Sequence, residues 1–129
     1  MSFRLENQVV CLTGASSGIG AAIAQALYAE GAKVVIGARR LEKLQAVAIE
    51  IKSKYPDSPG QIVAKSCDVT SRESVQALVQ QACTEYNVTS VSTMISCAGV
   101  MYFTQMTNAL IDHWHDTSDL TCNGAMTCI

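Results

Sequence analysis

Residues 13–20 read Thr-Gly-Ala-Ser-Ser-Gly-Ile-Gly, and this stretch decides the fold. The apolar run at residues 9–12 precedes it, and the segment after it spaces Ile23, Ala26 and Leu27 along one helical face. The first pattern is typical of a buried strand and the second of an amphipathic helix. A glycine-rich turn between a strand and a helix leaves the first N–H groups of the helix free for an anion. The sequence therefore predicts a phosphate-binding loop here, made by Gly14, Ser16, Ser17, Gly18 and Gly20.

The three glycines of this loop have different expected roles. Gly14 permits a tight turn, Gly18 lets the backbone approach a pyrophosphate, and Gly20 lets the helix pack closely on the sheet. No Lys-Ser/Thr pair follows the last glycine, so the loop is not a P-loop. The alternative is a glycine-rich turn that binds nothing. A strand before the loop and a helix after it favour the binding loop.

The rest of the chain continues the alternation of strand and helix. Further strands are expected over residues 33–38, 61–67 and 91–96, with helical faces over residues 41–55 and 75–86. Strands separated by helices favour a parallel sheet with right-handed crossovers, which is an α/β fold. At 129 residues the chain has the length of one domain, so residues 1–129 are expected to form a single one.

Three local signals mark the expected ends of helices. Gly31 stands where a C-cap glycine belongs. Thr70 and Glu73 have the spacing of a capping box, with Thr70 as the cap of the third helix. A last helix is expected to begin near Trp114, although its sequence is poor in strong helix formers.

The second expected strand ends in a basic pair, Arg39 and Arg40. Dinucleotide folds bind the adenosine ribose at this point, where an acid favours the 2′-hydroxyl of NAD and a basic residue the 2′-phosphate of NADP. Because no acid stands there, we predict NADP(H) rather than NAD(H) as the cofactor. The alternative is a solvated basic pair at a helix start. Arginine is a poor choice at that position unless an anion is near.

Composition narrows the remaining classes of function. The net charge is −2, and the nine Lys and Arg all precede residue 73, which argues against a nucleic-acid partner. No apolar stretch reaches the roughly 18 residues of a membrane span, and no signal peptide is visible. Six cysteines without a CxxC pair indicate reduced thiols, so a cytoplasmic location is expected. His113 and His115 do not share a helix face, so no metal site is predicted.

Four motifs in order resemble the N-terminal half of the short-chain dehydrogenase/reductase family. They are residues 13–20, Gly-Ala-Arg-Arg at 37–40, Cys-Asp-Val-Thr at 67–70 and Cys-Ala-Gly at 97–99. The resemblance implies a Rossmann-type sheet with strand order 3-2-1-4, flanked by helices and incomplete at the C-terminal side. It also implies hydride transfer between NADP(H) and a carbonyl or alcohol, with Asp68 and Val69 at the adenine and Ala98 and Gly99 beside the ribose. The cofactor-binding residues expected in all are Gly14, Ser16, Ser17, Gly18, Ile19, Gly20, Arg39, Arg40, Asp68, Val69, Ala98 and Gly99.

The chain also departs from the family pattern. No tyrosine has a lysine four positions later, no lysine follows Lys65, and Thr121 stands where the family has a catalytic Asn. No catalytic residue is therefore predicted, and we expect a truncated chain that is inactive alone. The alternative is a non-catalytic isoform or pseudoenzyme that pairs with a full-length relative through an open sheet edge or the last helix. A product without function is a third possibility.

Overall fold

The structure is a computed structural model that describes residues 4–98, 112, 115, 118 and 119. Strands and helices alternate along residues 4–98. In chain order they are β1 (Val9–Thr13), α1 (Gly18–Ala29), β2 (Lys33–Ala38), α2 (Leu41–Lys54), β3 (Gln61–Ser66), α3 (Arg72–Glu85) and β4 (Thr93–Ser96). All paired strands run parallel, in the order β3-β2-β1-β4. The predicted Rossmann-type α/β fold and strand order are confirmed.

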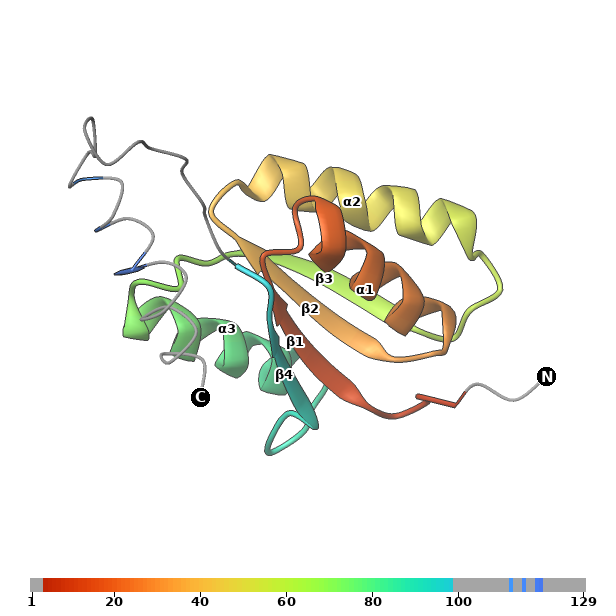
Figure 1. Cartoon of the computed structure of the whole chain (residues 1–129). Helices are drawn as coiled ribbons and strands as arrows, with labels where there is room; N and C mark the ends of the chain where they lie inside the picture. The colour runs from red at the N-terminus through yellow and green to blue at the C-terminus, as the bar shows by residue number, and fades with distance from the viewer. Residues whose placement is uncertain (1–3, 99–111, 113–114, 116–117, 120–129) are drawn as a thin grey trace.

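Helices cover both faces of the sheet (Figure 1). Helices α1 and α2 lie on one face and α3 lies on the other. Side chains of β1 therefore alternate between two cores. Leu12 packs in the core between the sheet and helices α1 and α2, whereas Cys11 packs in the core between the sheet and α3. Because both faces are covered, β1 is an uninterrupted apolar run rather than an alternating one.

The turn after α1 aims the chain into β2. Gly31 has a φ of +90°, in the left-handed region that favours glycine. The N–H of Ala32 donates to the carbonyl of Leu27 at 3.0 Å, and the N–H of Gly31 donates to that of Tyr28 at 3.0 Å. These two bonds form a Schellman motif, which satisfies the last carbonyls of the helix. The predicted C-cap glycine is confirmed.

The predicted cap of the third helix is wrong by one residue. The N-cap of α3 is Ser71, whose Oγ accepts a hydrogen bond from the N–H of Ser74 at 3.3 Å. The hydroxyl of Thr70 donates instead to Oδ1 of Asp68 at 2.7 Å. Thr70 thus stabilises the turn before the helix, and the helix begins one residue later than the capping-box spacing suggested.

Element ends differ slightly from the expected ones, and β4 has an unpaired edge in the described part. Strand β1 extends to Thr13, β3 ends at Ser66 and β4 begins at Thr93. Among residues 4–98, β4 pairs with β1 alone.

The expected helix from Trp114 lies outside the described residues. No helix in the described part is both long enough and apolar enough to cross a membrane.

Candidate functional site

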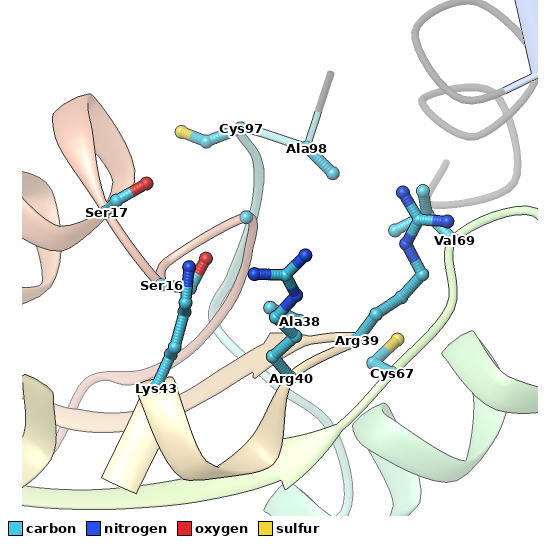
Figure 2. Close-up of a pocket in the computed structure, with 12 residues that line it drawn as sticks. Ser16, Ser17, Ala38, Arg39, Arg40, Lys43, Cys67, Val69, Cys97 and Ala98 are labelled. Atoms are coloured by element: carbon cyan, nitrogen blue, oxygen red, sulfur yellow. The ribbon is translucent and has the colours of Figure 1, made fainter. Parts of the chain in front are cut away.

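A pocket of about 360 Å³ opens at the carboxyl ends of the strands. Parallel strands end at the same edge of the sheet, so the loops that follow them gather there. At β1 the strand order changes direction, and such a switch point is where open α/β sheets bind ligands. Figure 2 shows the surrounding side chains. The lining consists of Gly14, Ser16, Ser17, Gly37, Ala38, Arg39, Arg40, Lys43, Cys67, Val69, Cys97 and Ala98.

The loop after β1 is held by close backbone contacts. Gly14 has a φ of +74°, and a Cβ there would overlap the backbone nitrogen of Ala98 and lie 2.7 Å from its Cα. A Cβ at Gly20 would overlap the carbonyl oxygen of Gly14. The N–H of Cys97 donates to the carbonyl of Thr13 at 3.0 Å, which ties the segment after β4 to the same turn. The glycine loop and the end of β4 therefore form one packed unit.

The N-terminus of α1 is free of internal competitors for an anion. Ser17 is the N-cap, but its side chain makes no capping hydrogen bond, and the first turn carries no acid. A Cβ placed on Gly18 would have no atom within 4 Å, so the space beside it is open. The first N–H groups of the helix and its positive dipole end can thus act on a bound anion.

Three cationic side chains line the pocket at the start of α2. Arg39 and Arg40 are exposed, and Lys43 joins them from the first turn of the helix. Neither arginine nor Lys43 is in an ion pair with any residue of the described part. Among the described residues, no carboxylate lines the pocket. The pocket therefore carries an uncompensated positive charge that suits an anionic ligand.

The acid Asp68, which stands between two lining residues in the sequence, is held by its own turn. Its Oδ1 accepts hydrogen bonds from the hydroxyl of Thr70 at 2.7 Å and from the N–H of Thr70 at 3.0 Å. These bonds, assisted by the positive charge of Arg39, lower the pKa of Asp68 below its ordinary value. Asp68 does not line the pocket, whereas its neighbours Cys67 and Val69 do.

The buried thiol of Cys11 has no chemical role at this edge. It lies in the core over α3, and burial raises its pKa to about 12. A thiol with that pKa is protonated at neutral pH and is a poor nucleophile. Cys11 acts as small core filler.

Comparison with known proteins identifies the family. The family model described as short chain dehydrogenase matches residues 8–129. The chain belongs to the short-chain dehydrogenase family. Glycine betaine reductase ATRR of Emericella nidulans is 44% identical to this chain. The match covers 97% of this chain and 9% of the reductase. An uncharacterised oxidoreductase of Listeria innocua is 36% identical over 97% of this chain.

A solved family member gives the same fold. The structure of L-sorbose reductase from Gluconobacter frateurii, complexed with NADPH and L-sorbose, superposes with a TM-score of 0.83 at 26% identity. The match covers 99% of this chain and 47% of the reductase. This short-chain dehydrogenase chain thus spans about half the length of that reductase and 48% of the Listeria protein.

The pocket brings together most of the residues predicted to bind the cofactor in this short-chain dehydrogenase chain. Those that line it are Gly14, Ser16, Ser17, Arg39, Arg40, Val69 and Ala98. Gly18, Ile19, Gly20 and Asp68 do not line the pocket; Gly18 and Asp68 stand next to lining residues in the sequence, and Ile19, at the start of α1, is 76% exposed. Gly99 lies outside the described residues.

Sequence reasoning missed five lining residues: Gly37, Ala38, Lys43, Cys67 and Cys97. A signal existed for Lys43, because it stands three residues after Arg40, in the first turn of the helix that follows the basic pair. His113, one of the two histidines weighed as metal ligands, lies outside the described residues. Within the described ones, no group of three or more His, Cys, Asp or Glu side chains is placed to hold a metal ion.

Proposed function

We propose that this chain is the dinucleotide-binding half of an NADP(H)-dependent oxidoreductase that interconverts a carbonyl and an alcohol. The observation that carries the proposal is the pairing of the glycine loop with Arg39 and Arg40 around one pocket. The glycine loop suits a pyrophosphate. Within the described part of the chain, the two arginines at the end of β2 make no ion pair and no acid lines the pocket, which suits a 2′-phosphate rather than a free 2′-hydroxyl.

The residues present fit such a dinucleotide. Ser16, Ser17 and the first N–H groups of α1 would hold the pyrophosphate. Arg39 and Arg40 would hold the 2′-phosphate. Val69, with Asp68 next to it, would lie at the adenine, and Ala98 and Gly99 beside the ribose. Bound NADPH supplies the hydride for the family reaction, and the role of this chain is to bind and orient it.

The proton needed for carbonyl reduction has no donor of the family type in this sequence. No tyrosine is followed by a lysine at the fourth position. A missing general acid costs about 10²–10⁴-fold in rate. We therefore propose that the 129-residue chain binds cofactor without turning over a substrate by itself.

Calorimetric titration of the chain with NADPH and with NADH tests the proposal. A charge-assisted hydrogen bond contributes about 1.5–3 kcal/mol, which is roughly a 10- to 150-fold difference in affinity. We expect NADPH to bind at least about 10-fold more tightly than NADH. Equal affinities, or tighter binding of NADH, would contradict the cofactor assignment.

A second candidate function is that of a non-catalytic partner for a full-length relative. It is favoured by β4, which pairs with β1 alone in the described part and carries the exposed residues Thr93 and Ser96. An unpaired strand edge can accept a strand from another chain. Light scattering after size-exclusion chromatography of the chain mixed with a full-length relative should then show a hetero-oligomer. Two separate peaks at the masses of the unmixed proteins would rule this function out for that pair.

The proposed location is the cytoplasm. Among the described residues, Cys11, Cys83 and Cys97 carry free thiols. Free thiols are the usual state of cysteine in a reducing compartment, which supports the assignment.

A further inference from the structure

We propose that Lys43 is a specificity-determining residue of this pocket, which selects nucleotides with a phosphate on the adenosine ribose. The inference rests on the proposed function and goes beyond the two arginines that the sequence suggested. Arg40 is the N-cap of α2, and Lys43 lies three residues later, in the first turn of the helix. Both line the pocket. Figure 2 shows the Lys43 amine at the end of the pocket where Ser16 lies, with the Arg40 guanidinium between it and Arg39.

Lys43 differs from Lys54, the lysine at the end of the same helix. Lys54 forms an ion pair with Glu50 at 3.1 Å and donates a hydrogen bond to Gln25 at 3.4 Å. Lys43 makes no ion pair within the described part of the chain, and its acidic neighbour Glu42 does not line the pocket. Its charge is thus available to a ligand.

The start of α2 contradicts the local preferences of a helix. Arg40 is the N-cap and makes no capping hydrogen bond, where Ser, Thr, Asp or Asn is preferred. Lys43 adds a positive charge to the first turn, where the helix dipole is itself positive, although Glu42 in the same turn suits that dipole. An anion between the Arg40 and Lys43 side chains would offset the repulsion of these two positive charges from each other and from the helix dipole. Departures from local preference of this kind are expected where function requires them.

Two observations bear on which phosphate Lys43 would contact: its amine lies toward Ser16 of the glycine loop, whereas its helix directly follows β2. The place of the helix favours the ribose phosphate over the pyrophosphate. The pyrophosphate of a dinucleotide lies at the N-terminus of α1, whereas the adenosine ribose lies at the end of β2, which leads into α2. A terminal phosphate also carries about −1.5 to −2 charges at neutral pH. The ammonium group of lysine is a compact charge that suits such a phosphate without a fixed geometry.

Two small nucleotides that differ by the phosphate in question provide the test. The 129-residue chain is titrated by calorimetry with adenosine 2′,5′-bisphosphate and with adenosine 5′-monophosphate. The variant Lys43→Gln is expected to bind the bisphosphate about 10-fold more weakly, since one charged contact is lost. Its affinity for the monophosphate should stay unchanged, and Lys43→Arg should restore most of the bisphosphate affinity.

The matched control is Lys52→Gln, which removes an exposed lysine from the last turn of the same helix, outside the pocket lining. It should leave both affinities unchanged. If Lys43→Gln loses the same affinity for both nucleotides, Lys43 contacts the 5′-phosphate that they share. If it loses affinity for neither, Lys43 does not contact the nucleotide. Either result overturns the inference. If the unmodified chain binds neither nucleotide, the proposed function fails, and the inference fails with it.

Discussion

Replacing Arg39 and Arg40 together with alanine is expected to weaken NADPH binding by about 100-fold and to leave NADH binding unchanged. Each guanidinium can make charge-assisted hydrogen bonds to a phosphate, at about 1.5–3 kcal/mol for each contact. Both side chains are exposed, so solvent screening keeps the combined effect of the two arginines at about 2.8 kcal/mol, slightly below twice the lower value for one contact. NADH has no 2′-phosphate for the arginines to contact, and the glycine loop that would hold its pyrophosphate is unaltered. Calorimetric titration of both cofactors gives the two affinities directly.

Arg72→Ala is the matched control for the arginine pair. Arg72 is also exposed and also begins a helix, α3, but it does not line the pocket. It should change neither affinity by more than about twofold, because a screened charge outside the site contributes little. A parallel loss of NADPH and NADH binding in the double variant would instead indicate that the arginines act through the start of α2. An unchanged NADPH affinity would remove the basis for the NADP assignment.

The substitution Gly14→Ala is expected to lower the free energy of unfolding by about 3–5 kcal/mol and to abolish nucleotide binding. Two costs combine at this position. A side chain at a φ of +74° is strained, and its Cβ would overlap the backbone of Ala98. Backbone atoms cannot rotate away as a flexible side chain can. The contact can be relieved only by separating the glycine loop from the segment after β4. Urea unfolding followed by circular dichroism measures the change.

Gly18→Ala separates the strain from the overlap. Gly18 also has a positive φ, +60°, but a Cβ there would meet nothing within 4 Å. It should therefore cost only the conformational strain, about 1–2 kcal/mol. Similar losses of stability in the two variants would show that the close approach of Gly14 and Ala98 does not hold the glycine loop to the segment after β4.

Most of the fold follows from patterns that a single sequence carries. The uninterrupted apolar run of β1 and the spacing of Leu44, Ala48 and Ile51 on α2 mark buried faces, and all three α2 residues are buried. The predicted start of α3 was wrong because two adjacent hydroxyl residues, Thr70 and Ser71, are both candidates for its N-cap. The Thr70 hydroxyl donates to Asp68, and Ser71 caps the helix. Spacing alone cannot rank two adjacent capping candidates.

The candidate site was only partly accessible to sequence reasoning. The glycine loop and the arginine pair carry local signals, whereas Cys67 and Cys97 become pocket residues only through the sheet order. Asp68 shows the opposite case. The motif implies a ligand contact, but its carboxylate is held by Thr70, and the residue does not line the pocket. Such competition for a polar group is visible only in three dimensions.

The contact between Gly14 and Ala98 also bears on the order in which the molecule folds. The β1–β2 pairing joins Val9 to Lys33, whereas the β1–β4 pairing joins Val10 to Thr93, across a much longer stretch of chain. Non-local parallel pairings form slowly, because the entropy of closing the loop is lost before any contact is gained. We therefore expect the β1–β2 pairing, which carries the glycine loop and both arginines, to form before β4 pairs with β1 and completes the pocket. Nucleotide binding during refolding would report that late event, and a nascent chain that ends before residue 93 would lack this wall of the pocket.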